Sequence, residues 1–146
     1  MITRLRQKIL LVLLLLLPGF LHAAEQTVAL DDGTSLKVFM FYPRDGEGTW
    51  PLCVLIAGGS ANEYVARAQF YLGKELATRG WAIAVPVSPD DNAFFGENAK
   101  MIPKVIDRLH QSPKITQGKT LLVGVSNGGS SALELAARNP QDYLGV

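Results

Sequence analysis

The hydrophobic positions of this 146-residue chain fall into short continuous runs separated by segments of helical spacing. Apolar runs without alternation are typical of strands buried on both faces of a parallel sheet. Three such runs occur, at residues 52–57, 81–87 and 120–125. Apolar residues at helical spacing predict helices over 63–79, 98–111 and 127–138. Pro103 should delay the start of the second helix or kink it.

Two strand-like runs at residues 27–30 and 36–42 precede these elements and flank the turn signal Asp31-Asp32-Gly33. They predict an antiparallel hairpin. Residues 143–146 look like the start of another strand. Strands that alternate with helices predict the α/β class, here a mostly parallel sheet with helices on both faces and right-handed crossovers.

The first two dozen residues follow a different pattern. Three basic residues precede an aliphatic run at 9–17, and then come Pro18-Gly19 and the small residues Ala23 and Ala24. This is the pattern of a secretory signal peptide. We therefore expect a signal peptide at 1–23 and a secreted or periplasmic domain at 24–146. The alternative is an uncleaved membrane anchor, but the run is far shorter than the roughly 20 residues that span a bilayer. We expect no stable membrane anchor.

Charge and composition narrow the function classes. Lys and Arg number 14 and Asp and Glu 13, and loss of three basic residues with 1–23 leaves 11 − 13 = −2. Such a balance gives no basic surface for nucleic acid. The single Cys53 and the two histidines, His22 and His110, are too few for a disulfide framework, a cysteine zinc site or a histidine-rich metal centre. We expect neither a metal nor a cofactor. An exported enzyme has no ATP or NADH supply, which favours hydrolysis or binding.

Gly124-x-Ser126-x-Gly128 lies between a predicted strand and a predicted helix. A sharp strand-to-helix turn strains the serine backbone, so the residues two positions away must lack side chains. Ser126 would then project from the sheet as a nucleophile, and the helix beginning at Asn127 would point its free N–H groups at a developing oxyanion. The alternative is a glycine-rich turn with an idle serine. A phosphate-binding interpretation fails, because the glycine spacing is not Gly-x-Gly-x-x-Gly and Gly118-Lys119-Thr120 precedes a strand instead of a helix.

With this motif, residues 27–146 resemble the α/β-hydrolase superfamily, in particular secreted bacterial esterases and dienelactone-hydrolase-like or prolyl-oligopeptidase-like members. The resemblance implies a serine hydrolase that acts on a small-molecule carboxylic ester, or on a peptide or amide, through an acyl-enzyme. It also implies that the Gly59 N–H and the Asn127 N–H form the oxyanion hole. Ala57 stands where the family commonly has histidine. The alternative for Gly58-Gly59 is a simple tight turn.

The serine also needs a base, normally a histidine held by a carboxylate. No histidine follows Ser126. His110 should lie at the amino end of the third parallel strand, roughly 20 Å from Ser126, and Asp142 comes too early for the triad acid. We therefore expect the N-terminal part of a longer hydrolase, inactive by itself, whose acid and histidine lie beyond Val146. The alternative is a non-catalytic secreted binding domain.

The remaining candidates have structural interpretations. Cys53 lies in a buried strand and should be inert. Asp90 and Asp91 are expected in a solvated loop, and Ser130 and Ser131 in the first turn of a helix.

Overall fold

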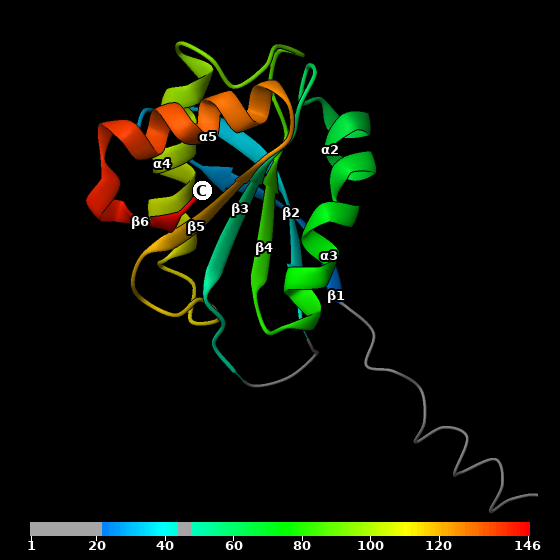
Figure 1. Ribbon diagram of the computed structural model, residues 1–146, viewed down its shortest axis with the longest axis vertical. Coiled ribbons are helices and arrows are strands. Elements are labelled where there is room, and N and C mark those ends of the chain that lie inside the picture. Colours follow the sequence, from blue (N-terminus) through cyan, green and yellow to red (C-terminus); the bar gives the residue numbers. More distant parts are fainter. Residues whose placement is uncertain (1–21, 44–47) are drawn as a thin grey trace, which may run out of the picture.

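The structure is a computed structural model that describes residues 22–43 and 48–146 (Figure 1). Within these ranges six strands form one sheet in the order β1-β2-β4-β3-β5-β6. The strands are β1 (His22–Ala29), β2 (Ser35–Tyr42), β3 (Leu52–Ile56), β4 (Ala82–Pro86), β5 (Thr120–Gly124) and β6 (Tyr143–Gly145). The helices are α2 (Glu63–Gln69), α3 (Tyr71–Thr78), α4 (Met101–Leu109) and α5 (Asn127–Arg138), with 3-10 turns at Asn98–Lys100 and Pro140–Asp142.

The sheet confirms the predicted α/β class. Strand β3 pairs in parallel with β4 and β5, and β5 pairs in parallel with β6. Every residue of β3 and β4 is buried, which explains their continuous apolar runs. Figure 1 shows α2 and α3 on one side of the sheet and α4 and α5 on the other. The core therefore lies in two layers, one on each face of the sheet.

The predicted hairpin is present, but β1 is longer than expected. It begins at His22, and its backbone pairs antiparallel with β2 from His22↔Tyr42 to Ala29↔Ser35. Ala23 and Ala24 carry little hydrophobic signal, so their pairing is fixed by β2 and not by their own pattern. The signal peptide predicted at 1–23 falls almost wholly outside the described residues and stays a prediction.

One predicted helix differs from expectation, and another begins late, as Pro103 predicts. The single helix predicted at 63–79 is two helices, because the chain turns at Phe70. There the Phe70 ring stacks on Phe41, with 3.2 Å between ring centroids, while Gly73 lets α3 approach Ile83 of β4. Helix α4 begins late, at Met101, and places Pro103 in its first turn, where a missing N–H costs nothing.

The loops after β3, β4 and β5 all leave the sheet at one edge, which we call the carboxyl edge. The three described non-glycine residues with positive φ lie in these loops: Ala61 (50°), Asp91 (57°) and Ser126 (53°). The loops also contact one another, since the Ser88 N–H donates to the Ala61 carbonyl at 2.8 Å. Backbone strain often collects at functional sites, and here it marks the carboxyl edge. Among the described helices, none is long and apolar enough to cross a membrane.

Candidate active site at the carboxyl edge

Ser126 occupies the turn between β5 and α5, as the motif predicts. Its backbone has φ 53° and ψ −123°, and the residue is exposed. A non-glycine residue in such a conformation costs on the order of 1–3 kcal/mol and persists only where its surroundings hold it. Two backbone bonds do so: the Val125 N–H donates to Ile56 at 3.1 Å, and the Ser126 carbonyl accepts from Gly129 at 2.9 Å. The serine side chain is therefore presented to solvent by a rigid turn.

The two glycines of the motif are required by close backbone packing. A Cβ on Gly124 would lie 2.4 Å from the Gly129 Cα, and a Cβ on Gly128 would lie 2.2 Å from the Ile56 carbonyl oxygen. Real Cβ atoms do not approach backbone atoms so closely. The Gly-x-Ser-x-Gly spacing thus has the steric cause expected from the sequence.

The loop at residues 57–62, which follows β3, lies directly beside this turn. A Cβ on Gly58 would lie 2.7 Å from the Val125 carbonyl oxygen and 3.2 Å from the Ser126 Cβ. Gly59 has φ +57°, and its carbonyl accepts a hydrogen bond from Asn127 Nδ2 at 3.0 Å. The structure therefore brings Gly59, Asn127 and Ser126 together at the carboxyl edge.

Two N–H groups beside Ser126 are free in the described part of the chain. Neither the Gly59 N–H nor the Asn127 N–H donates a hydrogen bond to a described acceptor. The Gly58 carbonyl accepts from Ala61 at 3.0 Å, so the 57–62 loop contains a tight turn. In a planar trans peptide the carbonyl and the N–H point in opposite directions. The Gly59 N–H therefore points away from Ala61 and stays available.

His110 lies at the opposite edge of the sheet, as predicted. It caps the C-terminus of α4, and its Nε2 is 2.9 Å from Oγ1 of Thr120, the first residue of β5. Ser126 follows the last residue of the same strand. A half-open cavity of about 250 Å³ beside His110 is lined by residues of α4, β6 and the start of β5. The described residues thus supply no imidazole to Ser126.

The carboxylates and Cys53 have the structural roles expected for them. Asp90 is exposed, and hydrogen bonds from Asn98, then Asn92 and Ser88, lower its pKa to about 2. Burial raises the pKa of the Cys53 thiol to about 12, so this thiol is inert. Over residues 22–43 and 48–146, no three His, Cys, Asp or Glu side chains converge on a metal position.

Three side-chain hydrogen bonds at this edge could not be predicted from the sequence. Ser131 Oγ donates to the Phe94 carbonyl at 2.7 Å and so joins the loop after β4 to α5. The Asn127 amide holds the Gly59 carbonyl, and Gln69 Oε1 accepts the Gly58 N–H at 2.6 Å. The first two bonds join residues 37 and 68 positions apart, and the third joins a helix residue to a loop 11 positions before it, so no local spacing signals them.

Solved structures show the same architecture. A dienelactone hydrolase from Anabaena variabilis ATCC 29413 is 21% identical with a TM-score of 0.67, over 84% of this chain and 60% of that chain. The S-formylglutathione hydrolase FrmB from Staphylococcus aureus is 14% identical with a TM-score of 0.68, over 88% of this chain and 59% of that chain. Esterase Est22 is 20% identical with a TM-score of 0.64, over 83% of this chain and 40% of that chain.

This chain thus spans about 40–60% of the length of these three structures. No protein-family model and no curated protein matches its sequence. The same fold is indicated by the sheet order, by the strained serine turn and by these structural neighbours. The chain is therefore an α/β-hydrolase-fold protein.

Proposed function

We propose that this chain is the nucleophile-bearing part of a secreted serine hydrolase that cleaves a carboxylic ester through an acyl-enzyme. The observation that carries the proposal is the placement of one exposed, strained serine beside two free backbone N–H groups. An idle serine in a glycine-rich turn would not need a strained backbone beside unpaired donors. Export is proposed from the signal-peptide pattern at residues 1–23.

In the proposed reaction the Ser126 hydroxyl oxygen attacks the carbonyl carbon of the substrate. A general base takes the hydroxyl proton, and the carbonyl oxygen becomes an oxyanion that accepts hydrogen bonds from the Gly59 and Asn127 N–H groups. The base then donates this proton to the leaving alcohol, and the acyl-enzyme forms. Water activated by the same base releases the acid and restores Ser126.

The base is the part that the described residues do not supply. A serine at its ordinary pKa is a weak nucleophile, so an imidazole must come within about 3 Å of its oxygen. We propose that this imidazole and its carboxylate partner come from sequence beyond Val146. The shorter span of this chain relative to its structural neighbours supports this assignment.

The ester class is favoured over a peptide by the neighbours, which bear the names esterase, dienelactone hydrolase and S-formylglutathione hydrolase. An ester or thioester leaving group departs more readily than an amine. The substrate proposed is therefore a small, soluble ester that reaches an exposed serine.

The test is turnover of p-nitrophenyl acetate by the product of the whole reading frame, compared with its Ser126→Ala variant. We expect Ser126→Ala to lower kcat by several orders of magnitude and to leave folding unchanged. Full activity in Ser126→Ala would reject the proposal. A second candidate, a non-catalytic binding domain, is favoured by the position of His110, which contacts Thr120 at the other end of β5 from Ser126. It predicts no turnover in either protein.

A further inference from the structure

The 57–62 loop is held from α2 by one side chain. The Gly58 N–H donates to Gln69 Oε1 at 2.6 Å, and Gln69 is the last residue of α2. Gln69 is half-buried, so this bond is shielded from full competition by water. The bond connects the loop beside Ser126 to α2. This helix and α5 lie on opposite faces of the sheet (Figure 1).

The Ala57–Gly58 peptide is held at both of its ends. Its N–H group meets Gln69, and its carbonyl oxygen points the other way, toward α5. There a Cβ on Gly128 would come within 2.7 Å of the Ala57 oxygen, which shows how closely the two backbones pack. This peptide therefore spans the space between α2 and α5 with little freedom to rotate.

Rotation of this peptide would change the direction of the next one, which carries the Gly59 N–H. We propose that Gln69 is a positioning residue of the oxyanion hole: it fixes the Ala57–Gly58 peptide and thereby aims the Gly59 N–H toward the oxyanion. This inference rests on the proposed function. It adds a residue that touches neither substrate nor Ser126 and acts only through the loop.

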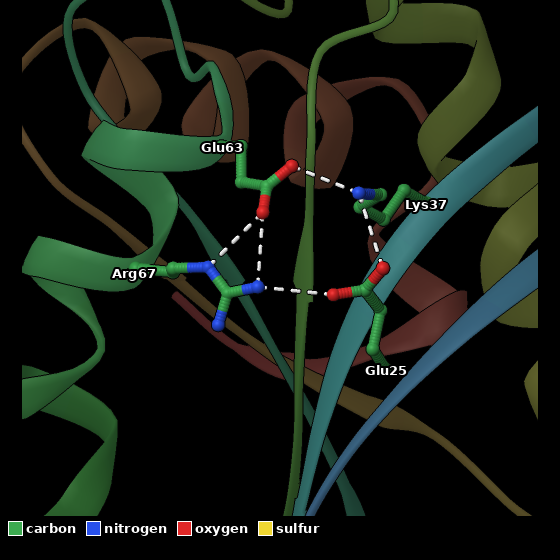
Figure 2. Close-up of polar contacts among 4 residues, drawn as sticks. All are labelled: Glu25, Lys37, Glu63 and Arg67. Carbon is green, nitrogen blue, oxygen red and sulfur yellow. Dashed lines mark hydrogen bonds and ion pairs between the residues drawn. The ribbon is translucent and has the colours of Figure 1, made fainter.

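Ion pairs hold helix α2 against strands β1 and β2, and this restrains the position of Gln69 at its C-terminal end. Figure 2 shows a four-residue ion-pair network made of Glu25 from β1, Lys37 from β2, and Glu63 and Arg67 from α2. Lys37 Nζ lies 2.8 Å from Glu63 and 3.1 Å from Glu25, and Arg67 Nη2 lies 2.9 Å from Glu63 and 3.0 Å from Glu25. The Arg67 guanidinium also stacks 4.2 Å from the Phe39 ring centroid.

Single exposed ion pairs contribute little, but a closed network with a stacked arginine restrains geometry more than any one pair. The network holds α2 against β1 and β2 from its first turn onward. Gln69, two residues after Arg67, then reaches the loop from a fixed direction.

The experiment compares Gln69→Met, Gln69→Glu and the control Gln111→Met in the product of the whole reading frame. Methionine keeps the length of the side chain but has no oxygen to accept the Gly58 N–H, whereas glutamate keeps an acceptor. Gln111 is an exposed glutamine after α4, at the opposite edge of the sheet.

With p-nitrophenyl acetate, Gln69→Met should lower kcat about 10-fold to 100-fold, less than deletion of an oxyanion donor. KM should change by less than about 3-fold, since a displaced oxyanion donor acts on the transition state. Gln69→Glu should recover most of kcat, and Gln111→Met should match the parent. A wild-type kcat in Gln69→Met, or equal losses in Gln69→Met and Gln69→Glu, would overturn the inference.

Amide hydrogen exchange at Gly58 provides a readout that does not need turnover. Gln69→Met should speed this exchange about 5-fold to 10-fold, as expected for loss of one hydrogen bond, and Gln69→Glu should not. Unchanged exchange in Gln69→Met would overturn the inference even if kcat fell. If Ser126→Ala kept full turnover while the exchange result held, the proposed function would fail and the loop contact of Gln69 would stand.

Discussion

The Asn127 side chain donates from Nδ2 to the carbonyl oxygen of Gly59 at 3.0 Å. The two residues whose N–H groups are proposed to form the oxyanion hole are therefore joined directly, although 68 positions separate them in the chain. One residue would serve twice: its backbone as a donor to the oxyanion, and its side chain as the tie that keeps the other donor in place.

Asn127→Ala keeps the backbone N–H and removes only this tie. We expect a loss of about 1 kcal/mol in the free energy of unfolding, the usual net value of one hydrogen bond, and a fall in kcat of about 10-fold. Asn127→Asp should be worse, because a carboxylate would face the Gly59 carbonyl oxygen. Urea unfolding and ester turnover measure the two effects. Equal behaviour of Asn127→Asp and the parent would contradict the role of the tie.

Gly128→Ala should disrupt the fold at the serine turn, because the added Cβ would lie 2.2 Å from the Ile56 carbonyl oxygen. We expect a destabilisation of at least about 3 kcal/mol, at the upper end of overpacking effects. Gly145→Ala is the matched control, since nothing lies within 4 Å of its Cβ position and its φ is not positive. Urea unfolding of the two variants measures this difference. Similar unfolding midpoints for Gly128→Ala and Gly145→Ala would contradict the predicted clash at Gly128.

The buried strands, the sheet class and the serine turn could be predicted because each depends on local pattern. A continuous apolar run specifies a strand with two covered faces, as in β3 and β4. The position of His110 also followed from topology, since a helix that returns to the start of β5 must end at its amino end.

Other features depend on contacts that only the folded chain creates. The break at Phe70 goes with the stacking of its ring on Phe41, and no helix-stop residue announces it. The start of β1 at His22 depends on pairing with Tyr42. Gln69 looks like any polar helix residue, because the Gly58 N–H that it accepts belongs to a loop before the helix.

The ion-pair network should make stability depend on pH at the acid end. Hydrogen bonds from Lys37 and then Arg67 lower the pKa of Glu63 below its ordinary 4.5. A carboxylate with a lowered pKa contributes stability that is present above its unfolded pKa and is lost as pH falls through the folded value. We expect Glu63→Gln to lower Tm slightly at pH 7, and the difference from the parent to shrink as pH falls below 4.5 and through the lowered pKa of Glu63.

At high pH the stability contributed by the network depends on Lys37, and its pH dependence has the opposite sign. Hydrogen bonds to Glu63 and then Glu25 raise the pKa of Lys37 above 10.5. Its contribution is present below the unfolded pKa and is lost only as pH rises through the folded value, so the Tm difference should stay constant from pH 6 to 9. If the Tm difference between Glu63→Gln and the parent persisted unchanged at pH 3, the loss of stability could not be assigned to the Glu63 carboxylate.

The exported protein should begin at Ala24 or Glu25. Either start retains Glu25, whose carboxylate contacts Lys37 and Arg67, so the ion-pair network survives cleavage. Intact mass of material from the periplasm or medium measures the N-terminus. Retention of Met1 to Leu17 in that material would contradict the signal-peptide prediction.

Ser126 is proposed as the nucleophile, and covalent labelling separates this role from that of an idle serine. The measurement is peptide mapping by mass spectrometry after reaction of the whole reading-frame product with a fluorophosphonate. We expect one phosphonyl group, on Ser126, absent from Ser126→Ala and absent from the 146-residue chain, whose described residues place no imidazole beside Ser126. A label on another residue, or an unlabelled Ser126 in a protein that hydrolyses esters, would contradict it.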